Sequence, residues 1–188
     1  MKNMNDSKIK SILEKLPFKK AVWLAPIIYF FHFLEEAVFG FYTFFGGNAT
    51  LIQFIIANSI IMSVYLILLV LFTLRPNRLN AFFVLTLIAA AQFFNTFYHL
   101  LWTIVFSRYC PGVVTGLLIY VPFFGLIMWI AYRDEYITKR SAVLIILLGA
   151  TLMTLFEIRG LQLIILIVSP TVVVVANIID YFKTKTKS

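Results

Sequence analysis

Six long apolar runs, separated by short polar breaks, make up most of this chain. Each run is close to the roughly 20 residues that an α-helix needs to cross the hydrocarbon core of a bilayer. The runs cover residues 20–45, 50–74, 79–106, 113–132, 141–156 and 160–181. They show no strand-like alternation and are too long for the strands of a membrane barrel. The pattern therefore predicts an all-α, polytopic membrane protein with about six transmembrane helices in one bundle.

The composition leaves little room for a soluble domain. Hydrophobic residues make up 62% of the chain and charged residues only 13%, whereas a soluble domain is about half apolar and about a quarter charged. We therefore predict one six-helix transmembrane domain over residues 20–182 and a basic cytoplasmic tail over residues 183–188. Because the fifth run is short, the alternative is that the fifth and sixth runs form a bent or shallow pair.

Residues 1–19 form a basic segment in front of the first apolar run. Ile9, Ile12, Leu13 and Leu16 recur at helical spacing among several lysines, and Pro17 follows them. This pattern is typical of a short amphipathic helix that lies on an anionic membrane surface. We predict such an interfacial helix, with membrane lipids as its partner; the alternative is a frayed basic tail.

The distribution of lysine and arginine predicts the orientation of the bundle. If the N-terminus is cytoplasmic, all of the 16 lysines and arginines except Arg108 and Arg159 lie on the cytoplasmic side. The positive-inside rule then favours a multi-pass protein of the plasma membrane with both termini in the cytoplasm. It also accounts for the net charge of +8 without nucleic acid as a partner.

The first run contains the pentapeptide His32-Phe-Leu-Glu35-Glu36. A charged residue at the centre of a transmembrane helix costs about 2.5–3.5 kcal/mol, so two carboxylates cost about 5–7 kcal/mol. With the run helical throughout, His32 lies near mid-membrane and Glu36 about 6 Å further out. Residues three and four apart share a helix face, so both carboxylates lie on the face of His32. The sequence thus predicts a buried polar site.

The third run contributes a second polar stripe. Gln92, Asn95 and His99 are spaced three and four residues apart, so they share one helix face. Both histidines of the chain lie in outward-running helices, in overlapping depth bands. We therefore expect the polar site in the outer half of the membrane, between the first and third helices.

One hypothesis for this site is a metal-dependent membrane enzyme that acts on a lipid or another small lipophilic substrate. Two imidazoles and a carboxylate form the ligand set of many zinc and iron centres. His32, Glu36 and His99 would then bind one divalent metal, zinc or iron, and leave one position open. Glu35 would act as the general base. The residues predicted to bind substrate are Asn95, Tyr98 and Arg108.

Two other hypotheses need no catalysis, so the sequence leaves open whether the chain is an enzyme. A small transporter could use the buried glutamates and histidines to bind a ligand or a proton, and its size would favour a homodimer. A non-catalytic accessory protein could use hydrogen bonds of His32 with Glu36 and of Asn95 with His99 to clamp helices together.

The chain also resembles a known family, the HXXEE-motif integral membrane proteins. The resemblance rests on the pentapeptide around His32, on the pair Asn95 and His99, and on the turn Tyr109-Cys-Pro-Gly112. It extends over residues 20–180. The family has no established activity, so the resemblance implies that His32, Glu35 and Glu36 act together and supplies no substrate. Cys110, the only cysteine, is interpreted as an inert loop thiol.

Overall fold

A computed structural model describes residues 15–158, 168 and 171–179, which are helical apart from short connections. The elements are α2 (Phe18–Ala21), α3 (Leu24–Val38), η1 (Phe41–Thr43), α4 (Leu51–Leu74), α5 (Arg78–Ile88), η2 (Ala89–Phe94), α6 (Asn95–Val105), α7 (Val113–Thr115), η3 (Gly116–Tyr120), α8 (Val121–Arg133) and α9 (Lys139–Glu157). Of these, η1 is a 3₁₀ turn and η2 and η3 are π-helical.

Five helical stretches in the described part are long and apolar enough to cross a membrane. They are Phe18–Val38, Leu51–Leu74, Arg78–Val105, Val113–Arg133 and Lys139–Glu157. The prediction of an all-helical, membrane-like chain is confirmed in this respect. Most of the predicted interfacial segment, most of the sixth run and the whole C-terminal tail lie outside the described residues.

The first helix is shorter than predicted. It ends at Val38 rather than continuing to residue 45, because Gly40 adopts the left-handed conformation with φ of 75°. Glycine in this conformation commonly terminates helices. His32 is therefore only about 9 Å, at about 1.5 Å per residue, from the end of α3. The polar pentapeptide lies near one end of the bundle and not at its middle.

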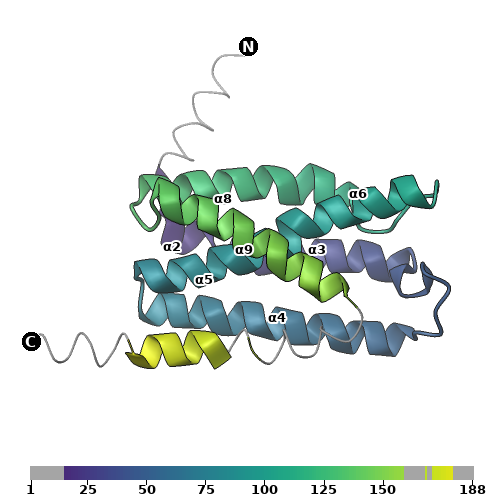
Figure 1. The fold of residues 1–188 in the computed structure, drawn as a ribbon, viewed down its shortest axis with the longest axis horizontal. Helices are drawn as coiled ribbons and strands as arrows, with labels where there is room; N and C mark the ends of the chain where they lie inside the picture. Colours follow the sequence, from purple (N-terminus) through teal and green to yellow (C-terminus); the bar gives the residue numbers. More distant parts are fainter. Residues whose placement is uncertain (1–14, 159–167, 169–170, 180–188) are drawn as a thin grey trace, which may run out of the picture.

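The helices lie lengthwise beside one another, and the chain reverses at two ends (Figure 1). We call the end where α3 and α6 finish and α4 and α7 begin the motif end. The opposite end, where α4 meets α5 and α8 meets α9, is the basic end. Within the described part Arg108 is the only lysine or arginine at the motif end. The basic end carries Lys15, Lys19, Lys20, Arg75, Arg78, Arg133, Lys139 and Arg140.

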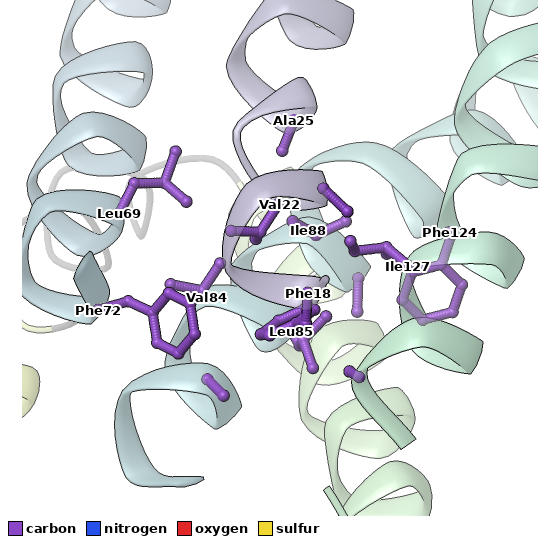
Figure 2. Close-up of a cluster of buried hydrophobic side chains, with 14 of the residues drawn as sticks. Phe18, Val22, Ala25, Leu69, Phe72, Val84, Leu85, Ile88, Phe124 and Ile127 are labelled. Atoms are coloured by element: carbon purple, nitrogen blue, oxygen red, sulfur yellow. The ribbon is translucent and has the colours of Figure 1, made fainter. Parts of the chain in front are cut away.

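The apolar core lies between the basic end and the pentapeptide. Figure 2 shows side chains from α2, α4, α5 and α8 meeting there, including Phe18, Phe72, Leu85 and Ile127, all buried. By contrast, α4 and α9 bury only a small share of their residues inside the bundle, as expected of helices that border lipid. The core includes Ala25 and Tyr29 of α3, and α3 packs against α4.

Candidate functional site

The polar site is built on α3 and α6. In α3, His32, Glu35 and Glu36 lie on the face turned into the bundle, and all three are buried. In α6, His99 is buried on the face toward α3. The helical spacing that predicted one polar face on each helix is confirmed, and the two faces meet.

The three predicted metal ligands come together around one point. Oε1 of Glu36 lies 3.4 Å from Nε2 of His32 and 3.1 Å from Nε2 of His99. All three potential ligand atoms lie within 4.8 Å of one another, and all three residues are buried. The arrangement therefore has the donor set and the spacing that a single metal ion requires.

Each histidine also has a partner on its other ring nitrogen. Nδ1 of His32 lies 2.8 Å from Oγ1 of Thr115, and Nδ1 of His99 lies 3.4 Å from Sγ of Cys110. Such partners fix the ring orientation and, by accepting from Nδ1–H, leave the Nε2 lone pair free for a ligand. In both histidines, Nε2 thus faces Glu36 and Nδ1 contacts a residue outside the predicted ligand set, as in many metal centres.

Asn95 lies between the two imidazoles. Its Nδ2 atom is 3.0 Å from Nε2 of His32 and 3.1 Å from Nε2 of His99. Asn95 was predicted to bind substrate, and the structure places its side-chain amide directly against both ring nitrogens. It is therefore part of the same cluster as the predicted ligands.

Glu35 is held by the segment that follows α6. Its Oε1 accepts from the backbone N–H of Gly112 at 2.9 Å and of Val114 at 3.3 Å. Its Oε2 accepts from the N–H of Thr115 at 2.8 Å, and the hydroxyl of Tyr109 also donates to Oε1. A carboxylate at the N-terminal end of a helix is favoured by the free N–H groups there. Glu35 therefore anchors the start of α7, while its assignment as a general base stays a prediction.

Gly112 allows the segment after α6 to close over both histidines. A Cβ atom at this position would lie 2.7 Å from Cε1 of His32 and 2.8 Å from Cε1 of His99. The backbone also has φ of 97°, which favours glycine. Aromatic rings complete the enclosure, since Tyr120 packs on His32 at 4.5 Å and Phe41 on His99 at 4.9 Å between ring centroids.

Two of the predicted substrate-binding residues contact other parts of the motif end. The hydroxyl of Tyr98 and Oγ1 of Thr154 on α9 are 2.9 Å apart. The guanidinium of Arg108 donates to the backbone carbonyl of Phe44. It also stacks on the ring of Phe44, with its central carbon 4.3 Å from the ring centroid. Among the described residues, Arg108 forms no ion pair with a glutamate. Their substrate-binding role stays a prediction.

The sequence reasoning missed the residues between α6 and α8 that support the cluster. Thr115 and Cys110 contact the histidines, and Tyr109 contacts Glu35. Burial, together with the charge of Glu36, raises the pKa of Cys110 to about 12. Burial and the hydrogen bond to Glu35 raise the pKa of Tyr109 above its usual value. Both side chains are therefore neutral at pH 7. The Cys-Pro-Gly turn is the sequence feature that could have indicated that these residues lie near the cluster.

Comparison with known protein families matches residues 23–127 to a family described as a protein of unknown function with an HXXEE motif. The match covers more than half of the chain and includes His32, Glu35, Glu36 and His99. No curated protein and no solved structure matches the chain.

Proposed function

We propose that this chain, which belongs to the HXXEE-motif family, is a membrane protein that binds one divalent metal ion through His32, Glu36 and His99. The observation that carries the proposal is the convergence of two Nε2 atoms and one carboxylate oxygen inside the bundle. Zinc and iron are the metals that this mixed nitrogen and oxygen donor set suits.

The local electrostatics support a cation at this point. When Thr115 and Cys110 accept from the Nδ1–H groups, both Nε2 atoms carry lone pairs, which accept from the amide nitrogen of Asn95 and also lie against Oε1 of Glu36. Three acceptor atoms then crowd together, and a buried carboxylate without a cation costs several kcal/mol. A metal ion at their centre removes the repulsion and neutralises the charge of Glu36.

The proposed activity is that of a membrane enzyme acting on a lipid or another lipophilic substrate. A bound zinc or iron would supply an activated water or a polarised carbonyl. The position of His32, about two turns from the end of α3, brings the site toward the depth of lipid ester linkages and headgroups. Glu35 would orient the enclosing segment, with Tyr98 and Arg108 at its edge available for substrate.

The charge asymmetry supports the proposed orientation. In the described part, eight of the nine lysines and arginines lie at the basic end, and only Arg108 lies at the motif end. By the positive-inside rule the basic end faces the cytoplasm and the metal site lies in the outer half of the membrane. The proposed location is the plasma membrane.

A second candidate function follows from the other tautomer of the histidines. If both rings carry Nε2–H and Asn95 presents its oxygen, donors and acceptors match without a metal. The cluster would then be a hydrogen-bonded clamp between α3 and α6 in a transporter or accessory protein. The observation that supports this candidate function is the proximity of the Asn95 amide to both imidazole rings.

Metal analysis of the detergent-purified protein separates the two functions. After incubation with zinc or iron and removal of the excess, we expect about one ion per chain in the wild type. The His32→Ala/His99→Ala variant should bind none, and the milder Glu36→Gln variant should bind much less while remaining monodisperse. Tyr98→Phe is the matched control because its hydroxyl contacts Thr154 instead of the cluster. Metal-free wild-type protein, or full occupancy in the variants, would contradict the metal proposal.

Incubation of the metal-loaded protein with membrane lipid extracts then tests the enzyme assignment. We expect a change in lipid composition that is lost in Glu36→Gln and kept in Glu135→Gln, whose exposed carboxylate lies at the basic end. A metal-loaded protein that leaves every lipid unchanged would favour a binding or accessory role.

A further inference from the structure

The side-chain amide of Asn95 occupies the place of a fourth ligand. It lies 3.0 Å from Nε2 of His32 and 3.1 Å from Nε2 of His99, and these are two of the three proposed ligand atoms. Asn95 is four residues before His99 in the chain, so both side chains leave the same face of α6. The amide is therefore held in the cluster by the helix itself.

Four of the six separations among these atoms are close to those of a tetrahedral site. With metal–ligand bonds of about 2.0–2.1 Å, the ligand atoms of a regular tetrahedron are about 3.3 Å apart. The two Nε2 atoms lie 3.0 Å and 3.1 Å from Nδ2 of Asn95, and 3.4 Å and 3.1 Å from Oε1 of Glu36. Only small outward shifts of the side chains would bring a zinc-sized ion to normal bond lengths.

A half-turn of the amide supplies the oxygen that a metal needs. The amide nitrogen has no available lone pair, whereas Oδ1 is an acceptor, and rotation about the last side-chain torsion exchanges the two. Within the described residues Oδ1 of Asn95 has no hydrogen-bond partner, so the rotation breaks no bond other than those to the two Nε2 atoms. Those two nitrogens would bind the ion instead.

We propose that Asn95 is the fourth protein ligand of the metal, through Oδ1, in a site of two histidines, one glutamate and one asparagine. This inference rests on the proposed metal site. It changes the coordination from three protein ligands with an open position to four protein ligands. A shell of four protein ligands leaves no position for water in the resting state. A substrate oxygen then reaches the ion by displacing the amide of Asn95.

Cobalt(II), which reports coordination through its visible spectrum, is the probe for this proposal. Wild type, Asn95→Ala, Asn95→Asp and the control Tyr98→Phe are loaded with cobalt and titrated with azide and with a chelator. In the wild type and in Tyr98→Phe we expect a spectrum that azide does not change. In Asn95→Ala we expect an azide-dependent spectrum and cobalt affinity lower by about tenfold or more, since one ligand is lost.

Asn95→Asp keeps an oxygen ligand and adds a charge, so we expect it to bind cobalt at least as tightly as wild type and to remain insensitive to azide. This variant separates loss of the ligand from loss of the fold. If the wild type binds cobalt but responds to azide as Asn95→Ala does, with equal affinity, the fourth-ligand assignment is wrong and the three-ligand site stands. If the wild type binds neither cobalt nor zinc nor iron, both the site and this assignment are wrong.

Discussion

Nε2 of His99 lies 3.1 Å from Oε1 of Glu36, and this contact joins the first and third membrane-length helices inside the bundle. The pair is enclosed by the segment between α6 and α7, whose Gly112 lies against both imidazoles. The turn at Gly112, whose backbone N–H donates to Glu35, therefore supports the placement of His99 beside Glu36. The first two predictions concern these supporting residues.

Replacing Gly112 by alanine should open the cluster. The added Cβ would be 2.7–2.8 Å from both Cε1 atoms, closer than real Cβ contacts, so the segment or the rings must shift. We expect a lower unfolding temperature and reduced metal binding, measured by thermal unfolding in detergent and by elemental analysis. Forcing alanine to positive φ costs about 1–3 kcal/mol by itself.

Gly46→Ala is the matched control for that backbone cost. Gly46 also has positive φ, at 72°, but a Cβ there would meet no atom within 4 Å. It should carry the same backbone cost of about 1–3 kcal/mol and leave metal binding intact. If Gly112→Ala binds metal as well as Gly46→Ala does, the close approach of Gly112 to the imidazoles does not shape the site.

Replacing Glu35 by glutamine tests the anchoring role of this carboxylate. The glutamine keeps one acceptor oxygen but turns an NH₂ group toward N–H donors such as those of Gly112 and Thr115. Hydrogen bonds to a charged group contribute about 1.5–3 kcal/mol each, so we expect a clear fall in unfolding temperature. Tyr109→Phe removes a single donor and should cost less. An unchanged unfolding temperature in Glu35→Gln would contradict the anchoring role of this carboxylate.

The hydrophobic pattern was sufficient to predict the helices and the partners of the site. Runs of apolar residues predicted the five described spans because backbone groups in lipid must be satisfied within helices. The spacing of His32 with Glu36, and of Asn95 with His99, predicted which residues face each other. The overlapping depths of His32 and His99 in two outward-running helices were enough to predict that the two histidines lie close together.

The sequence could not predict details that depend on tertiary contacts. Phe39 to Phe45 is as apolar as the helix before it, so hydropathy did not reveal that Gly40 ends α3. The contacts of Thr115 and Cys110 with the imidazoles depend on the path of a turn, which has no helical period. The sequence suggested different roles for Glu35 and Glu36, but only the position of the turn reveals that backbone N–H groups hold Glu35.

A third prediction concerns the basic end, where Asp134 joins the first and fourth spans. Its carboxylate accepts from the N–H of Phe18, at the start of α2, and from Nε of Arg133, each at 2.7 Å. Burial alone would raise the pKa of Asp134, but these hydrogen bonds outweigh it and lower the pKa below the usual value. Asp134 therefore contributes stability above its unfolded pKa of about 3.9, and this contribution is lost as pH falls through the folded pKa.

The comparison for Asp134 is thermal unfolding of wild type and Asp134→Asn between pH 7 and pH 3. We expect the variant to unfold at a lower temperature at pH 7 and the difference to shrink in acid. Glu135→Gln, which changes the neighbouring exposed carboxylate, is the control. Its unfolding temperature should equal that of the wild type at each pH. A difference that stays constant over the whole range would mean that the charge of Asp134 is not the source of its contribution.

The fourth prediction concerns Cys110, whose thiol lies beside His99 and is buried. A Cys–His contact can mark a nucleophile, but here the pKa of the thiol is raised to about 12 from an ordinary value of 9.0. At pH 8 this lowers the thiolate fraction about 10³-fold, and alkylation by iodoacetamide should slow at least in proportion. We expect full labelling only after denaturation, and Cys110→Ser should keep metal binding because its hydroxyl still accepts from Nδ1–H. Rapid labelling of the folded protein at pH 8 would instead identify Cys110 as a reactive thiol and His99 as its base.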